Sequence, residues 1–254
     1  MENFDFYISS NGYFVVPEYN IEYKIDPILS NIPSMPESSE IAVKVAGRDG
    51  DIPLSSTYEP LLFEIVCYTD DNLTPAEKNT EEQRINTFLN TIKSETKTMA
   101  MQFEEKFYDV KYTGKLTTER YPKHIKFTIP LKSSNPYGKN LTKSVIEGNG
   151  TLTSNTVKDV GAVFTINGPA QTPVIALNDY QMEYENVVLE NYKLIIDSGN
   201  STITLVAPSG TKTNAMRYYN HEFPKIKNGQ NELKVQSGIT TATQVKVEWY
   251  DLKL

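Results

Sequence analysis

The fold is decided by the stretch from Ala46 to Tyr137, which opens with Ala46-Gly47-Arg48-Asp49-Gly50-Asp51 and continues with Leu61-Leu62-Phe63-Glu64-Ile65-Val66-Cys67-Tyr68. The first segment is a glycine-rich turn, and the second alternates apolar side chains on one face, which predicts a strand. One amphipathic helix and several further strands follow. Almost everything outside this stretch has the pattern of strands, so the helix is a fold signature that indicates little chemistry.

The helix is predicted from the spacing of its apolar residues. Two capping boxes compete for its start, Thr74-Pro75-Ala76-Glu77 and Thr80-Glu81-Glu82-Gln83. The helix is therefore expected over about 80–95, with an earlier start left open, and a single apolar stripe indicates that it lies on a sheet. The stripe has the i, i+3, i+4, i+7 spacing of one helical face and consists of Ile85, Phe88, Leu89 and Ile92.

Strands before and after the helix complete the first half of the chain. An Asn11-Gly12 turn between two apolar runs predicts an opening hairpin. After the helix, strands are expected at 99–103, 107–116 and 125–131. Pro130 favours an edge position for the last strand, because proline lacks the N–H group that a sheet ladder requires. A polar stretch follows this strand, and we place a domain boundary at 140.

The segment from 19 to 56 is expected to leave the core. It contains prolines at 27, 33, 36 and 53, and so long a connection is either disordered or laid against a neighbouring surface. Its apolar side chains favour the second alternative. They are Ile25, Ile28, Leu29, Ile32 and Met35.

The second half shows short strands and no helical periodicity. Strands are expected at 163–166, 174–177, 192–196, 202–205, 233–235 and 245–250, at spacings typical of a sandwich. Two antiparallel sheets packed face to face, of galectin-like or jelly-roll type, are the predicted form. The sequence thus predicts a mainly β chain with two domains, 1–140 and 141–254, the first a β-sandwich with one α-helix and an extended segment.

Charge and composition narrow the classes of function. The 254 residues carry a formal net charge of −7, and residues 1–140, with 21 acidic and 15 basic side chains, hold −6 of it. Tight nucleic-acid binding is not expected, because it needs clustered basic side chains. An acidic surface would instead allow DNA to slide past without binding. No apolar run reaches the ~18 residues of a membrane helix. The first five residues do not resemble a signal peptide. We therefore expect that the protein is made in a cytoplasm and does not insert into a membrane.

The sequence offers no constellation of residues typical of catalysis. His124 and His221 lack a second histidine or cysteine at a metal-ligand spacing, and no P-loop, Gly-x-Ser-x-Gly elbow or Cys-x-x-Cys pair occurs. The single cysteine, Cys67, lies on the apolar face of its strand, where a buried and inert thiol is expected. The turn at 47–51 lacks the ligand positions of a calcium loop. We therefore expect no enzyme, no catalytic residue, no cofactor and no metal.

A carbohydrate-binding sandwich is the alternative function. Tyr184, Tyr218 and Tyr219 form a possible partner or glycan face, because carbohydrate modules stack sugar rings on aromatic side chains. In a sandwich, however, such residues more often belong to the core or to an interface. Carbohydrate binding predicts an exposed row of aromatic rings on one sheet, whereas a core or interface role does not.

Five local motifs and the order of elements point to one family. The motifs are Gly47-Arg48-Asp49-Gly50, Pro136-Tyr137, Phe223-Pro224, Gly229-Gln230-Asn231-Glu232 and Ile166-Asn167-Gly168-Pro169-Ala170-Gln171-Thr172-Pro173. Together with the opening hairpin and the strand-helix-strand order, they span essentially the whole chain. In these respects the chain resembles the distal tail protein (Dit) family of long-tailed, siphovirus-type phages. The resemblance implies a tail-tube-like first domain and a galectin-like or carbohydrate-module-like second domain.

The resemblance also implies a function. Members of the family form a hexameric ring, the baseplate hub of the phage tail, and contact the tail tube protein, the tail tip protein and receptor-binding proteins during host attachment. This implies a virion structural protein, with DNA only as passing cargo in the bore of the ring. Residues 19–56 would form a belt that reaches the next subunit. The belt candidates are Ile25, Ile28, Leu29, Ile32, Met35, Gly47, Arg48, Asp49 and Gly50.

Overall fold

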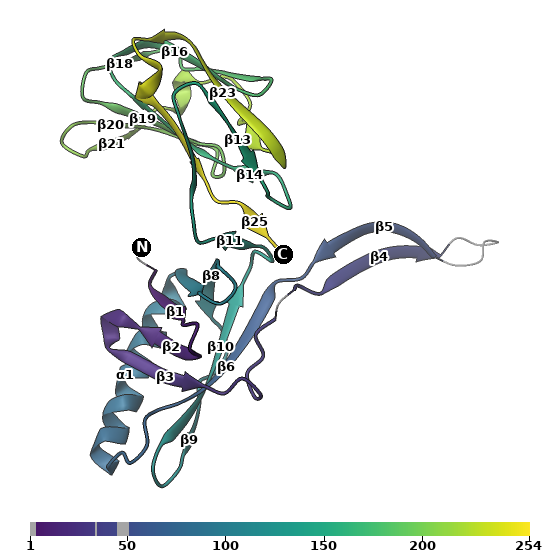
Figure 1. Ribbon diagram of the computed structural model, residues 1–254, viewed down its shortest axis with the longest axis vertical. Helices are drawn as coiled ribbons and strands as arrows, with labels where there is room; N and C mark the ends of the chain where they lie inside the picture. The colour runs from purple at the N-terminus through teal and green to yellow at the C-terminus, as the bar shows by residue number, and fades with distance from the viewer. Residues whose placement is uncertain (1–3, 34, 45–50) are drawn as a thin grey trace. The chain divides into compact units, whose positions relative to one another are not determined.

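The computed structural model describes residues 4–33, 35–44 and 51–254 (Figure 1). The chain divides into two compact units, Met1–Leu141 with Leu254, and Thr142–Lys253, which we call unit 1 and unit 2. In the described part of the chain, no helix is long and apolar enough to cross a membrane. The prediction of a mainly β chain is confirmed, and α1 is the one α-helix among the described residues.

Unit 1 is built on a closed, barrel-like sheet. Its elements are β1 (Phe6–Ile8), β2 (Tyr13–Val16), η1 (Pro17–Tyr19), β3 (Ile21–Ile25), β4 (Ser38–Lys44), β5 (Asp51–Tyr58), β6 (Leu61–Tyr68), α1 (Pro75–Ser94), β7 (Lys97–Met101), β8 (Lys106–Tyr112), β9 (Thr117–Arg120), β10 (Ile125–Ser133) and β11 (Gly138–Asn140). The strand order is β11-β8-β7-β1-β2-β3-β6-β10-β9, and β8 also pairs with β10. This additional pairing closes a ring of seven strands.

Alternating side chains fill the barrel. In β10 the inward positions predicted from the sequence are buried, with exposed fractions of 0–1%. The apolar stripe of α1 is buried in the same core, where the Phe88 ring packs edge-on against Phe6 at a centroid distance of 5.2 Å. Such edge-to-face contacts are favourable for aromatic rings. The helix therefore lies on the sheet, as its single stripe predicts.

The first of the two possible capping boxes starts the helix. Thr74 Oγ1 accepts a hydrogen bond from Glu77 N at 3.3 Å, and Glu77 Oε2 accepts one from Thr74 N at 2.7 Å. These bonds satisfy N–H groups that have no partner within the helix. Pro75 occupies the first helical position, where its missing N–H costs nothing. The second candidate start, Thr80, lies inside the helix.

The prediction that Pro130 lies on an edge strand is wrong. β10 pairs with β6 along one side, and along the other with β9 at its start and β8 at its end. Pro130 lies between these two partners, and its carbonyl accepts a hydrogen bond from Thr113 N at 3.1 Å. The N and O atoms of a residue in an antiparallel strand point to the same side. The missing N–H therefore falls in the gap where β9 gives way to β8.

The segment from 19 to 56 contains three strands that the sequence prediction missed. β3 belongs to the barrel, with every second side chain buried. β4 and β5 pair only with each other, from Ser38↔Tyr58 to Lys44↔Asp51, and form a separate two-stranded ribbon (Figure 1). We call this ribbon the arm. Four of the belt candidates, Gly47, Arg48, Asp49 and Gly50, lie outside the described residues.

Unit 2 contains two larger antiparallel sheets. Its elements are β12 (Ser144–Glu147), β13 (Gly150–Ser154), β14 (Val160–Gly161), β15 (Val163–Asn167), β16 (Ala170–Leu177), β17 (Tyr180–Glu183), β18 (Val187–Val188), β19 (Lys193–Asp197), β20 (Thr202–Val206), β21 (Lys212–Asn214), η2 (Met216–Tyr218), β22 (Lys225–Ile226), β23 (Gly229–Ile239), η3 (Ala242–Gln244), β24 (Val245–Trp249) and β25 (Leu252–Lys253). One sheet has the order β12-β24-β15-β19-β20-β21, and the other has β13-β23-β16-β17 with β18 beside β16. β14 pairs with β22.

The two sheets of unit 2 share one core. Phe164 of β15 and Ile175 of β16 are both fully buried and belong to the same cluster of apolar side chains. Six strands predicted from the sequence are confirmed, whereas short or polar strands such as β13 and β21 were missed. Unit 2 is therefore a β-sandwich.

Candidate assembly surface

A short turn after β3 holds two apolar side chains in solvent. We call residues 26–31 the turn. Asp26 Oδ1 accepts hydrogen bonds from the backbone N atoms of Ile28, at 2.9 Å, and Leu29, at 3.1 Å. Asp26 Oδ2 accepts one from Tyr68 Oη at 3.2 Å. Hydrogen bonds to the charged form, first that from Leu29 and then that from Ile28, hold the pKa of Asp26 below its ordinary value.

The turn is fastened at both ends to β6. Asp26 N donates to Val66 O at 2.8 Å, and Asn31 exchanges two backbone hydrogen bonds with Glu64, at 2.8 and 2.9 Å. Between these points Ser30 Oγ accepts from Val66 N at 2.9 Å and donates to Val66 O at 3.2 Å. Residues 27–30 therefore bulge outward from a strand edge, where their side chains have no route into the barrel core.

The exposure of the turn follows from this bulge. Ile28 is 90% exposed and Leu29 is 53% exposed, and Met35 a few residues later is 59% exposed. Apolar area removed from water contributes about 25 cal/mol per Å². A turn that is ordered by its own hydrogen bonds, yet leaves two large apolar side chains in water, gains free energy when another surface covers it.

Two further belt candidates lie elsewhere. Ile25 is only 7% exposed, because it takes an inward position of β3 and belongs to the barrel core. Ile32 is half-buried and packs against the same core. The assignment of Ile25 to an exposed belt is therefore corrected, since its burial is provided by its own chain.

The arm has unpaired strand edges, and none of its residues whose burial the structure describes belongs to the core of unit 1. At its root Glu59 N donates to Glu37 O at 2.8 Å, and the Tyr58 ring packs edge-on against Tyr137 at a centroid distance of 5.9 Å. Further out, Val43 is 44% exposed. An isolated two-stranded hairpin is marginally stable in water, and free strand edges are templates for pairing with another chain. The arm therefore has the properties of an assembly element.

A polar hollow beside β3 and α1 contains three side chains that are partnered with one another. Tyr23 Oη donates to Glu81 Oε2 at 2.9 Å, and Glu81 Oε1 pairs with Arg84 Nη1 at 2.7 Å. Burial, with the Glu81 carboxylate adding to it, raises the pKa of Tyr23. These partnered groups fasten the helix to the sheet.

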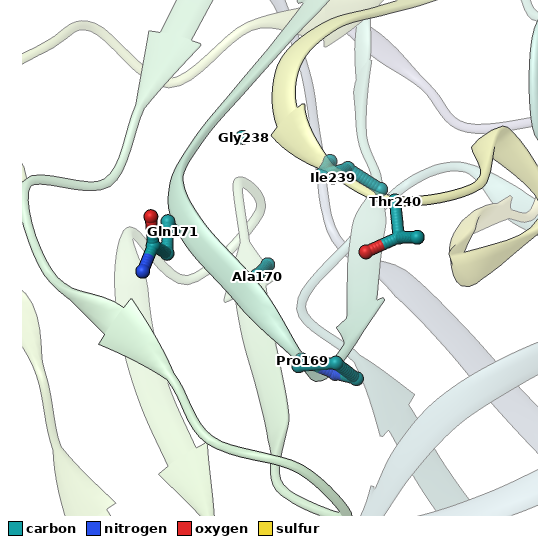
Figure 2. A pocket seen from close by; sticks show the side chains of 6 residues that line it. All are labelled: Pro169, Ala170, Gln171, Gly238, Ile239 and Thr240. Atoms are coloured by element: carbon teal, nitrogen blue, oxygen red, sulfur yellow. The ribbon is translucent and has the colours of Figure 1, made fainter.

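Unit 2 has an open hollow where β16 and β23 meet (Figure 2). Gly238 is required there, because its φ is +74° and a Cβ atom would lie 2.0 Å from the Gln171 carbonyl oxygen. The lining of the hollow contains no aromatic side chain on which a sugar ring could stack and no basic side chain that could pair with an acid. It is lined by Pro169, Ala170, Gln171, Gly238, Ile239 and Thr240.

The three candidate tyrosines of unit 2 do not form an exposed face. Tyr184 and Tyr219 are 1% and 7% exposed and belong to the sandwich core. Tyr218 packs against that core, with its ring centroid 5.8 Å from that of Tyr184. Burial raises the pKa of Tyr219 to about 12. Because buried rings cannot stack on a sugar, the assignment of Tyr184 and Tyr219 to a glycan face is wrong.

The structure also places Cys67 and one of the two histidines. Cys67 is buried as predicted, and burial raises the pKa of its thiol. His124 Nδ1 lies 3.3 Å from Asp71 Oδ1, and its ring stacks on Tyr121 at 4.9 Å. Among the described residues, no group of three or more metal-ligating side chains of His, Cys, Asp or Glu occurs.

Comparison with known proteins identifies the fold. No protein-family model and no curated protein matches the chain. The crystal structure of SPP1 Dit (gp 19.1), described as a paradigm of the hub adsorption apparatus in phages that infect Gram-positive hosts, is similar with a TM-score of 0.65. Its identity is 11%, over 92% of this chain and 97% of that chain. The chain has the Dit fold.

A second solved structure supports the same fold. A chain of the phage P2 baseplate in its activated conformation with Ca is similar with a TM-score of 0.56 and 9% identity, over 97% of this chain and 95% of that chain. The likeness to both structures extends over both units, since more than nine-tenths of this chain is covered in each case. The Dit resemblance drawn from the sequence motifs is thus confirmed for the fold.

Leu62 of the barrel is an exposed apolar residue that the sequence does not single out. Leu62 in β6 is 59% exposed, although both of its neighbours, Leu61 and Phe63, are buried. The available signal was the alternation itself, because a strand with Leu61 and Phe63 inside must turn Leu62 outward. An outward leucine joins Ile28, Leu29 and Met35 as an exposed apolar side chain of unit 1.

Proposed function

We propose that this chain is a structural protein of a phage tail hub. Copies of it assemble into a hexameric ring at the distal end of the tail tube, and the ring joins the tube to the tail tip or baseplate and to receptor-binding proteins. The protein is then part of the virion and has no catalytic role. The Dit fold supports the proposal, because the similar structures are a phage hub protein and a chain of a phage baseplate.

The observation that carries the proposal is the arm together with the turn. The barrel is complete within one chain, whereas the arm has unpaired strand edges and the turn holds Ile28 and Leu29 in solvent. Large exposed apolar side chains on an ordered surface mark sites of protein contact. A second copy of the chain supplies the missing cover for both elements.

The charge of the first half fits a ring through which DNA passes. Residues 1–140 hold a net charge of −6, and a surface of that sign repels phosphate groups. DNA is then cargo in the bore and is not bound. Membrane insertion has no part in this proposal.

The oligomeric state of the full chain tests the proposal. Light scattering over a range of concentrations is expected to show a particle of six times the chain mass of 28.7 kDa, and micrographs are expected to show rings. A purely monomeric protein at high concentration, with no ring in micrographs, would overturn the proposal.

Removal of the arm sharpens this test. The hydrogen bond between Glu59 N and Glu37 O shows that the ends of the arm are adjacent, so a two-residue Asn-Gly turn can replace residues 38–58. We expect this variant to keep the unfolding midpoint of the parent chain and to stay monomeric. Rings formed as readily without the arm would show that the arm has no role in assembly.

A further inference from the structure

The polar hollow beside β3 and α1 is small. Its volume is about 250 Å³, and we call it the acidic hollow. Pockets for drug-sized molecules measure roughly 300–1,000 Å³, so this one suits a single side chain or a molecule of similar size. The lining residues that matter here are Glu22, Tyr23, Asp70, Leu73, Glu81 and Arg84.

The acidic hollow begins where the ladder between β3 and β6 ends. The last pair of that ladder is Lys24↔Tyr68. The same antiparallel register, continued by two residues, places Glu22 opposite Asp70, on the face of the sheet that carries Lys24 and Tyr68. Both acidic residues are exposed and line the hollow. One carboxylate therefore lies beside each strand.

The acidic hollow has an excess of negative charge. Its lining contains three acidic side chains and one basic side chain, a net charge of −2. Glu81 and Arg84 form an ion pair, with Oε1 and Nη1 at 2.7 Å. Glu22 and Asp70 form no ion pair with any residue that the structure describes. Like charges opposite each other on neighbouring strands repel, so a cation between them is stabilised.

The remaining lining is ordered by bonds within the chain. Tyr23 Oη donates to Glu81 Oε2 at 2.9 Å, so both oxygens of Glu81 are engaged. Leu73 N donates to Lys123 O at 2.9 Å, which fixes the backbone of a half-buried leucine. Leu73 offers apolar surface, whereas Glu22 and Asp70 offer hydrogen-bond acceptors. This combination matches a side chain with an apolar stem and a cationic head.

We propose that the acidic hollow binds an arginine side chain of a partner protein, with the guanidinium group between the carboxylates of Glu22 and Asp70. The planar guanidinium carries five N–H donors, enough for two carboxylates, whereas the ammonium of lysine is a compact point charge. Metal binding is not favoured, because no cluster of three metal-ligating side chains occurs in the described part of the chain.

Methyl NMR of the full chain with labelled leucine tests this site. The probe N-acetyl-arginine methylamide is expected to shift the methyl signals of Leu73 saturably, with a dissociation constant of about 1 mM. Leu189 in unit 2 is 57% exposed and should not respond. The corresponding citrulline compound has nearly the same shape and no charge, so it is expected to cause no saturable shift.

Removal of the two carboxylates tests the role of charge. Glu22→Gln with Asp70→Asn keeps the size of both side chains and is expected to weaken binding of the arginine probe about tenfold or more. The matched control, Glu40→Gln with Asp179→Asn, removes two exposed acidic groups outside the hollow and should bind like the parent. Parent binding should also weaken between 0.1 and 1 M salt, where the screening length falls from about 10 to 3 Å.

The site is wrong if Leu73 shows no saturable shift, if the citrulline compound shifts it equally, or if the variant without the two carboxylates binds with the affinity of its control. Displacement of the probe by an equal concentration of Mg²⁺ would also overturn it, because the hollow would then prefer a metal ion. Urea unfolding checks that each variant is folded. These results are independent of ring formation, so the hub function stands or falls by the oligomeric state alone.

Discussion

β5 and β6 are consecutive strands of eight residues each. They differ in how many of their edges are paired with other strands of the same chain. β6 pairs with β10 along its whole length, and on its other side β3 and the turn satisfy its backbone. β5 pairs only with β4, and Ser55, Thr57 and Tyr58, the residues of β5 whose burial the structure describes, are exposed. In the proposed hub, β6 therefore serves the stability of the barrel and β5 serves assembly, so substitutions in β5 should leave stability unchanged.

The largest effect is expected inside the barrel. Phe127 is fully buried and its ring lies 5.3 Å from that of Tyr23, so Phe127→Ala leaves a cavity that costs about 3–5 kcal/mol. Urea unfolding of the full chain measures this loss. Thr128→Ala, the outward neighbour, is the control and should change stability by less than about 0.5 kcal/mol. A small effect of Phe127→Ala would show that the barrel does not depend on this packing.

The converse result is expected in the turn. Ile28→Ser with Leu29→Ser keeps the backbone hydrogen bonds to Asp26 and should leave the free energy of unfolding within about 0.5 kcal/mol of the parent. Assembly should weaken by about 2 kcal/mol per contact, roughly thirtyfold in concentration, because two apolar side chains no longer become buried. Light scattering measures the shift.

The control for the turn lies in unit 2. Val145 and Val157 are also exposed apolar residues, at 38% and 49%, and their replacement by serine should leave assembly unchanged. Equal weakening by both pairs of substitutions would show that exposed apolar area in general, and not the turn, drives association.

A moderate effect is expected at the start of α1. Thr74→Ala removes the side-chain oxygen that accepts from Glu77 N and should lower stability by about 1 kcal/mol. Thr80→Ala in the competing motif should be neutral, since Thr80 lies inside the helix and alanine is the better helix former. Thermal unfolding distinguishes the two. A larger loss from Thr80→Ala would contradict the observed cap.

The smallest effect concerns acid. The pKa of Asp26 is lower in the folded chain than its ordinary value of 3.8, so the stability that its charged form gives the turn is fully present above that value. It is lost as the pH falls through the lower, folded pKa. Protection of the Ile28 and Leu29 amides against hydrogen exchange should therefore decrease only below about pH 4. Asp26→Asn, which does not titrate, should abolish this pH dependence.

Local patterns in the sequence were sufficient for the helix and for many strands. The apolar stripe of α1 and the alternation at 125–131 each depend on near neighbours, and both are confirmed. The sequence prediction lacks β3 because the prolines of the segment indicate a loop. The apolar alternation of Ile21, Tyr23 and Ile25 nevertheless predicts a strand, and it lies before the first of those prolines, at 27.

Features that depend on pairing between distant strands could not be predicted in this way. The position of Pro130 is tolerated because two different strands adjoin β10 on one side, and no local pattern shows that change of partner. Lys111 and Lys132 become neighbours only through the register of β8 and β10. The burial of Tyr184 and Tyr219 likewise requires the second sheet of unit 2 to cover them.

The hydrogen bond between Glu59 N and Glu37 O has a consequence for how such proteins can diverge. It makes the arm an insertion whose two ends meet at one point of the barrel. The length and composition of an insertion of this kind can change without moving the strands from which it departs. Related proteins can therefore keep the same barrel while their arms differ. In the proposed hub, a different arm would change which protein surface it contacts.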